Sequence, residues 1–187
     1  MKQFCLKCGR GMAHAIPESD NRPRWLCEAC GYIHYENPRV IAGCIPVWED
    51  RVLLCRRAID PRSGLWTLPA GFLEQGETIS AGAARETLEE ACCVVHPSEL
   101  YTVINVPHIH QIHMFYLADM ASAEHAPGAE SLETRLCTES EIPWDLLAFP
   151  TVIFTLKAFF EDRAAGNFRQ RIHDILVPMR HPQGEMV

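Results

Sequence analysis

The stretch from Gly71 to Cys93, GFLEQGETISAGAARETLEEACC, constrains the fold more than any other part of the chain. A glycine after an apolar run predicts a sharp turn or a close backbone approach, and a helix follows it. Three carboxylates of that helix stand at positions i, i+3 and i+4, which places them on one face. They are Glu86, Glu89 and Glu90. Like charges at this spacing repel by roughly 0.2–0.5 kcal/mol per pair unless a cation joins them.

A divalent cation is the ligand that this acidic face predicts. Mg²⁺ prefers carboxylate oxygens and usually keeps waters and substrate phosphates as its other ligands. The simpler interpretation is a solvated acidic face, which is the usual one for an E-x-x-E-E pattern alone. Two neighbours favour the metal. Arg85 can reach Glu89 one helical turn along, and Glu77 lies near the helix start, where the macrodipole favours a carboxylate.

Together these residues resemble the Nudix box, G-x5-E-x7-R-E-U-x-E-E-x-G-U, in which U is apolar. Every charged position matches, through Gly71, Glu77, Arg85, Glu86, Glu89 and Glu90. Two positions depart from it, because Thr87 replaces an apolar residue and Cys92 replaces the glycine that ends the helix. A residue other than glycine there must become left-handed or let the helix end in another way. The departures concern the end of the helix, not the metal ligands.

Composition sets the class of protein. A chain of 187 residues that is 48% hydrophobic and 22% charged is typical of a soluble globular protein. The net charge of −7 argues against a nucleic-acid partner, which needs a basic surface. We expect no membrane partner, because no apolar run is long enough for a span, and a cytoplasmic location, because the N-terminus lacks a signal-peptide core.

Two C-x2-C pairs, each followed by glycine, predict a zinc ribbon over residues 1–38. Their four thiolates suit tetrahedral Zn²⁺ in a closed structural site; they are Cys5, Cys8, Cys27 and Cys30. Nine cysteines, an odd number, fit a reduced compartment better than a disulfide framework. Residues 1–38 hold five basic and four acidic side chains, too small an excess for phosphate binding, so we expect a structural role.

Asn37-Pro38 marks the start of a second domain, residues 39–187. VIAGCIPVW and VLLCRR predict two strands joined by a tight turn, and LWTLPAGF predicts a short strand whose Trp66 and Leu68 lie in the core. The second strand ends at Arg56 and Arg57, one of which could face phosphate, although solvent is an equally good interpretation.

The segment after the box predicts two strands broken near Pro97 and Pro107. An H-x-H-x-x-H pattern begins directly after Pro107. On a strand, His108 and His110 would share one face and His113 the other. Their spacing fits no common zinc site, so a structural role is the expectation and substrate contact the alternative. Farther on, residues 121–131 predict a loop, TRLCT a strand, TVIFTLKAFFEDRAAG a helix ended by glycine, and RIHDILV a strand before a polar tail.

This element order, without repeated βαβ units, predicts an α+β fold. The Nudix resemblance implies an α/β/α sandwich with a mixed sheet, preceded by the ribbon. It also implies a homodimer that binds Mg²⁺ (or Mn²⁺) through Glu86, Glu89, Glu90 and the Ala70 carbonyl. Glu90 would be the most direct ligand, and we expect it to be largely exposed. Arg85 would orient carboxylates. The base would be Glu130, Glu133 or a metal-bound hydroxide.

The resemblance implies a nucleoside diphosphate linked to a small molecule as the substrate. The strings FCLKCG, CGYIHYENP, GLWTLPAGF and APGAESLETRL are most similar to ribbon-bearing ADP-ribose and FAD pyrophosphatases, which release AMP. Pro107 resembles a marker of the ADP-ribose enzymes. The SQPWPFP string of NADH pyrophosphatases is absent, which argues against NADH. The alternatives are NADH or nucleoside triphosphate hydrolysis and a Nudix regulator that senses a ligand without cutting it.

Overall fold

The computed structural model describes residues 3–177, so the polar tail expected after RIHDILV lies outside the described residues. Its backbone divides into two compact units, Met1–Asn37 and Pro38–Val187. Neither of the α-helices in residues 3–177 is long and apolar enough to cross a membrane.

The first unit is a small antiparallel sheet with two cysteine turns. Its strands β1 (Ala13–Ala15), β2 (Arg24–Leu26) and β3 (Ile33–His34) pair in the order β1-β2-β3. After each C-x2-C pair the chain turns through a left-handed glycine, with φ of 72° at Gly9 and 70° at Gly31. Each of these glycine amides donates to the carbonyl of the first cysteine of its pair at 2.8 Å.

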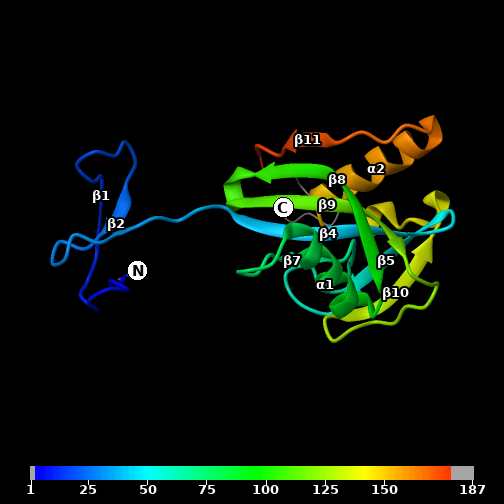
Figure 1. The fold of residues 1–187 in the computed structure, drawn as a ribbon, viewed down its shortest axis with the longest axis horizontal. Helices are drawn as coiled ribbons and strands as arrows, with labels where there is room; N and C mark the ends of the chain where they lie inside the picture. The colour runs from blue at the N-terminus through cyan, green and yellow to red at the C-terminus, as the bar shows by residue number, and fades with distance from the viewer. Residues whose placement is uncertain (1–2, 178–187) are drawn as a thin grey trace. The chain divides into compact units, whose positions relative to one another are not determined.

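Within residues 38–177 the second unit is built on an eight-stranded sheet (Figure 1). The central strands pair in the order β10-β5-β4-β9-β8-β11, while β6 pairs with β5 and β7 with β4. The sheet is mixed, because the β4–β9 and β8–β11 pairs are parallel and the others antiparallel. The elements are β4 (Arg39–Trp48), β5 (Arg51–Arg57), β6 (Trp66–Thr67), β7 (Ala70–Phe72), α1 (Ile79–Ala91), β8 (Val95–Val106), η1 (Pro107–Ile109), β9 (Gln111–Met120), β10 (Ser131–Cys137), η2 (Glu139–Glu141), η3 (Trp144–Leu146), α2 (Pro150–Ala165) and β11 (Arg171–Asp174).

The two helices cover opposite faces of this sheet. Side chains alternate between faces along a strand, and on β4 Cys44 packs in the cluster that includes Ala83 of α1. Its neighbour Ile45 packs instead in the cluster that includes Leu156 of α2. Figure 1 shows the two helices on either side of the strands. The expected α+β fold, an α/β/α sandwich with a mixed sheet, is confirmed.

A buried carboxylate fixes α2 to the edge of the sheet. Asp162 is 3% exposed and accepts hydrogen bonds from the Tyr101 hydroxyl of β8, at 2.8 Å, and from the Arg171 guanidinium of β11. The ion pair with Arg171 lowers the pKa of Asp162 to about 2. The helix ends, as expected, at a left-handed Gly166 with φ of 64°. Three distant segments therefore meet at one carboxylate.

The strands after the box differ from the expectation in two ways. The chain does not break at Pro97, because β8 runs through it with a shift of register. His108 and His110 are not on a strand: His108 belongs to η1 and His110 ends it in a left-handed conformation, while His113 alone is on β9. Pro107 at the first position of η1 explains this, since proline suits a helix start and cannot donate within a sheet.

Candidate active site

Helix α1 is capped by a threonine at its start and ends at a left-handed cysteine. The Thr78 hydroxyl accepts a hydrogen bond from the Ala81 amide at 3.2 Å, which caps the first turn. Cys92 ends the helix in the left-handed region (φ 47°, ψ 33°), where glycine is usual, and its amide donates to the Leu88 carbonyl. Thr87 fills an apolar position because its buried hydroxyl donates to the Ala83 carbonyl at 2.8 Å, one turn back.

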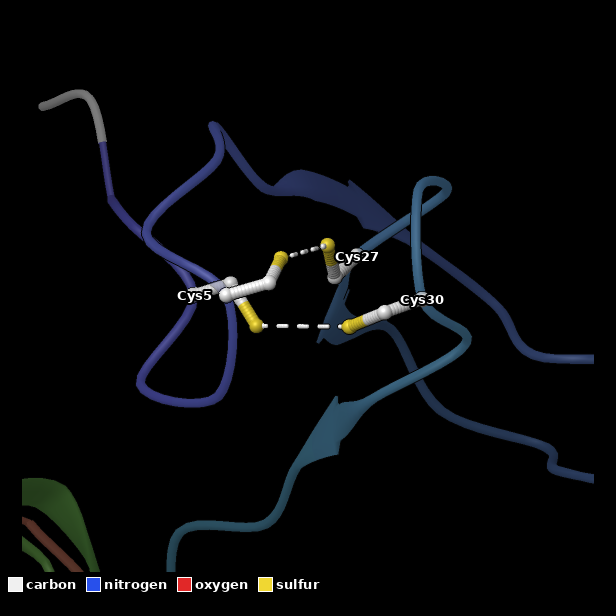
Figure 2. A group of neighbouring side chains, drawn as sticks. Cys5, Cys27 and Cys30 are labelled. Carbon is white, nitrogen blue, oxygen red and sulfur yellow. Dashed lines mark hydrogen bonds between the residues drawn. The ribbon is translucent and has the colours of Figure 1, made fainter.

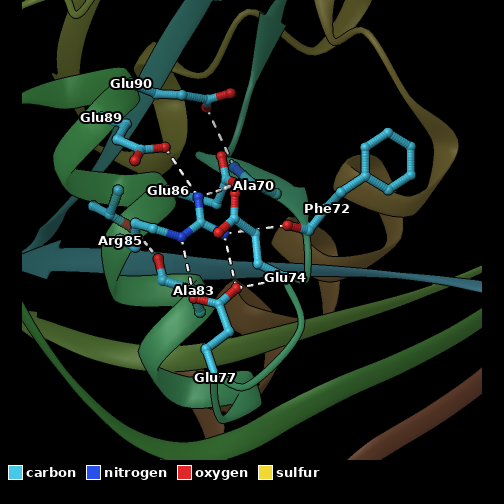
Figure 3. Close-up of polar contacts among 10 residues, drawn as sticks. Ala70, Phe72, Glu74, Glu77, Ala83, Arg85, Glu86, Glu89 and Glu90 are labelled. Carbon is cyan, nitrogen blue, oxygen red and sulfur yellow. Dashed lines mark hydrogen bonds and ion pairs between the residues drawn. The ribbon is translucent and has the colours of Figure 1, made fainter.

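Arg85 holds three carboxylates at once (Figure 3). Its guanidinium donates to Glu77 at 2.9 Å, to Glu86 at 2.8 Å and to Glu89 at 3.0 Å. It also donates to the carbonyl of Phe72 on β7 at 3.2 Å. These hydrogen bonds with Arg85 lower the pKa of Glu77 to about 2, so Glu77 stays ionised as a fixed partner of the arginine. Arg85 therefore links helix α1 to the turn that precedes it.

Gly71 gives room for one of these carboxylates. A methyl group in place of its hydrogen would overlap the Glu86 carboxyl group, although φ at Gly71 is not in the left-handed region. The side chain of Glu86 is 13% exposed, and this burial raises its pKa, against the opposing effect of Arg85. The glycine of the motif is thus needed for the close packing of Glu86 on β7.

Glu90 is buried, so the expectation that it would be largely exposed is wrong. Glu90 is 7% exposed, and one of its carboxylate oxygens accepts a hydrogen bond from the Ala70 amide at 3.3 Å. Figure 3 shows it on the side of the helix that faces β7, next to Ala70. Burial raises the pKa of Glu90 to about 8, and the negative charge of Glu86 adds to the effect. Without a cation, this carboxyl is largely protonated at neutral pH.

The loop from 121 to 131 holds the C-terminal end of α1. The amides of Ala126 and Gly128 donate to the carbonyls of Ala91 and Glu90, at 2.9 and 3.0 Å. A side chain at Gly128 would collide with the backbone carbonyl of Glu89. This contact is not predicted from the sequence. Its only signal in the sequence was a glycine within a loop, which does not tell which backbone approaches it.

Glu130, at the end of this loop, and Glu133, just after it, have different surroundings. Glu133 on β10 forms ion pairs with Arg135 at 2.7 Å and Arg56 at 3.7 Å. The charge of Glu130 instead acts on both Glu86 and Glu90 and contributes to their raised pKa values. Of the two, Glu130 is the one that adds negative charge to the acidic face of α1.

The four cysteines of the first unit form a compact cluster (Figure 2). The Cys5 and Cys30 sulfurs are 3.7 Å apart, those of Cys8 and Cys27 are 3.5 Å apart, and all four lie within 4.8 Å of one another. Zn–S bonds of about 2.3 Å in a tetrahedron require sulfurs about 3.8 Å apart. The cluster therefore has the donor set and the size of a zinc site.

Comparison with known proteins identifies the family. The NUDIX domain model matches residues 37–155, and the model of the Nudix N-terminal zinc ribbon matches residues 3–36. The chain belongs to the Nudix family. A Nudix hydrolase of known structure from Nitrosomonas europaea is 49% identical, with a TM-score of 0.91, over 93% of this chain and 99% of that one.

More distant relatives carry more specific names. The NAD-capped RNA hydrolase NudC of Photorhabdus laumondii is 33% identical over 125 residues, which cover 65% of this chain and 46% of the relative. The chain thus matches about half the length of that relative. An ADP-ribose pyrophosphatase from Streptococcus suis shares the fold at 19% identity, with a TM-score of 0.59, over 74% of this chain and 99% of that chain.

The acidic face of this Nudix domain fits a hard divalent cation. Its donors are carboxylate oxygens, and Glu86 and Glu90 have raised pKa values because burial leaves their charge undercompensated. Three or more His, Cys, Asp or Glu side chains can hold a metal ion when their ligand atoms lie close together. In residues 3–177 only the four cysteines form such a group, with all ligand atoms within 4.8 Å of one another. Glu86 and Glu89 accept hydrogen bonds from the same nitrogen of Arg85. Glu90 accepts one from the Ala70 amide.

Proposed function

We propose that this chain hydrolyses the diphosphate bond of a nucleoside diphosphate derivative, with Mg²⁺ (or Mn²⁺), and releases AMP. The observation that carries the proposal is the undercompensated pair of carboxyls, Glu86 and Glu90, packed against β7. Buried carboxyls with raised pKa values in a polar site indicate function more often than stability, because they cost folding energy. A cation bound by both carboxylates would remove that cost.

In this proposal the residues have separate roles. Glu86, Glu89, Glu90 and the Ala70 carbonyl would hold the metal, whose chemistry is to polarise water and offset charge on phosphate oxygens. Glu77 and Arg85 would keep the acidic side chains in position, because each is hydrogen-bonded to the other. Glu130 would accept the proton of the attacking water, since its charge acts on the same site while Glu133 is paired with two arginines.

Two observations bear on the substrate and point in different directions. The strings around the box and the missing SQPWPFP segment favour FAD or ADP-ribose. The curated relatives carry the name NAD-capped RNA hydrolase, which favours an NAD-type dinucleotide instead. FAD, ADP-ribose and NADH all contain AMP joined through a diphosphate, so AMP is the expected product from each of them, whereas NAD-capped RNA would release nicotinamide mononucleotide and keep the adenosine monophosphate at its 5′ end.

One experiment separates these substrates. The full chain is incubated with Mg²⁺ and FAD, ADP-ribose, NADH, NAD-capped RNA or a nucleoside triphosphate, and the products are separated and identified. AMP should appear from FAD, ADP-ribose or NADH, or nicotinamide mononucleotide and a 5′-monophosphate RNA from NAD-capped RNA, and chelation of Mg²⁺ should stop the release of these products. Brisk turnover of triphosphates alone would contradict the proposal. Ligand binding without any hydrolysis would favour a sensing regulator.

The first unit carries a separate proposal. We propose that residues 1–38 form a structural zinc domain, that residues 39–187 form the hydrolase domain, and that the chain acts as a homodimer in the cytoplasm. Metal analysis should find one zinc per chain, and Cys27→Ser should lose it, because Cys27 is a buried member of the cluster. Full zinc content in that variant would contradict the four-thiolate site. Cys92→Ser, at an exposed thiol outside the cluster, is the matched control.

A further inference from the structure

Strand β5 ends in two arginines with different surroundings, and Arg56 is the one whose charge is matched. Its guanidinium lies 3.7 Å from the Glu133 carboxylate, and its Nε donates to the Gly64 carbonyl at 3.0 Å. The residue is exposed. An exposed, paired arginine of this kind contributes little to binding or stability.

Arg57 is oriented by two neighbours and, in the described part of the chain, forms no ion pair. Its Nε donates to the Pro61 carbonyl at 3.0 Å, and its guanidinium carbon lies 5.2 Å from the ring centre of Phe149. Within residues 3–177 no carboxylate is close enough to form an ion pair with it, although the residue is half-buried. A guanidinium has five N–H donors, so most of those of Arg57 remain for a ligand.

The position of Arg57 places this cation beside the acidic face of α1. Cys55 and Arg57 are two residues apart on β5 and share one face, and the Cys55 thiol lies 3.9 Å from the Glu90 carbonyl. The charge of Arg57 acts on the Glu90 carboxyl and opposes the rise of its pKa. In the strand register Arg57 faces Ser131, the residue that follows Glu130.

We propose that Arg57 binds a non-bridging oxygen of the substrate's diphosphate, and that Arg56 does not. The inference deepens the proposed function and depends on it for the identity of the substrate. A planar guanidinium matches phosphate oxygens in a fork, and the ring of Phe149 and the carbonyl of Pro61 hold it in one orientation before the ligand arrives. The ligand class is therefore a phosphate or diphosphate ester that reaches the metal site.

The test compares Arg57→Ala with the matched variant Arg56→Ala in the full chain. Two quantities are measured: kcat/KM on the compound that the screen identifies, and the Kd of AMP by calorimetry with Mg²⁺ present. One charge-assisted hydrogen bond corresponds to about 10- to 100-fold, so Arg57→Ala should lower kcat/KM and weaken AMP binding by that factor. Arg56→Ala should change both by less than about threefold.

Equal effects of the two variants would overturn the inference, as would a larger effect of Arg56→Ala. If Arg57→Ala does not fold, Arg57→Lys is tested instead, because lysine keeps the charge but cannot bind two oxygens as a guanidinium does. AMP binding as tight as in the wild type would then contradict the inference that the guanidinium binds the phosphate. If no compound is hydrolysed, the binding of AMP and inorganic pyrophosphate still tests Arg57. Weaker binding by Arg57→Ala would then support the inference while the hydrolytic proposal fails.

Discussion

Glu90→Gln should reduce hydrolysis by about 1,000-fold or more, because a neutral amide cannot give the metal the charge of a carboxylate. The main effect should be on kcat. The fold should survive, since glutamine has the same shape and its amide oxygen can still accept from the Ala70 amide. Steady-state kinetics and circular dichroism check the two parts. An active Glu90→Gln enzyme would remove Glu90 from the metal site.

The same residue should make metal binding depend on pH. The pKa of Glu90 is about 8, so the ion must displace a proton at neutral pH, and the apparent affinity for Mg²⁺ should rise as the pH rises towards 8. In the metal-free protein the sign for stability is the opposite. The folded state keeps the Glu90 proton to a higher pH than the unfolded state, so the contribution of Glu90 to stability falls between pH 4.5 and 8. Glu90→Gln should lose both pH dependences, which calorimetry and denaturant titrations would show.

Gly71→Ala should reduce activity by about 100-fold while the chain stays folded. The added methyl overlaps the Glu86 carboxyl, which must move, and a displacement of about 1 Å at a reacting centre costs about this factor. The residue does not have the left-handed φ that would make alanine itself strained. The reduction should be partly offset at high Mg²⁺ concentration, because the displaced ligand weakens metal binding.

Gly11→Ala is the control for this variant. It makes the same chemical change in the first unit, where a Cβ meets nothing within 4 Å and φ is not left-handed. Kinetics over a range of Mg²⁺ concentrations compares the two. If Gly71→Ala is as active as Gly11→Ala, Glu86 either has room to move without loss or does not bind the metal.

The sequence predicted the local features of the site and much of the fold. A glycine at a close backbone approach and three glutamates at helical spacing are properties of neighbouring residues, and each appears in the structure as expected. The helix that ends at Gly166 and the hairpin between β4 and β5 were found in the same way. In all of these cases the residues that predict the feature lie within a few positions of one another in the sequence.

The rest depended on contacts between distant segments. The burial of Glu90 follows from the packing of α1 on β7, which no local pattern shows. The different surroundings of Glu130 and Glu133 follow from a shift of register between β10 and β5. An alternating pattern that continues through Pro107 predicts a strand at His108 and His110, but a 3-10 turn there ends the alternation.

The two hydrogen bonds from Ala126 and Gly128 to the end of α1 connect the proposed proton acceptor, Glu130, to the proposed metal ligand, Glu90. The same short segment that leads to Glu130 also completes the last turn beneath Glu90. An insertion or deletion in this segment would therefore alter the proposed metal site as well as the surface loop. In a homologue whose segment has a different length, other donors must bind those two carbonyls, or the last turn of the helix will be less stable.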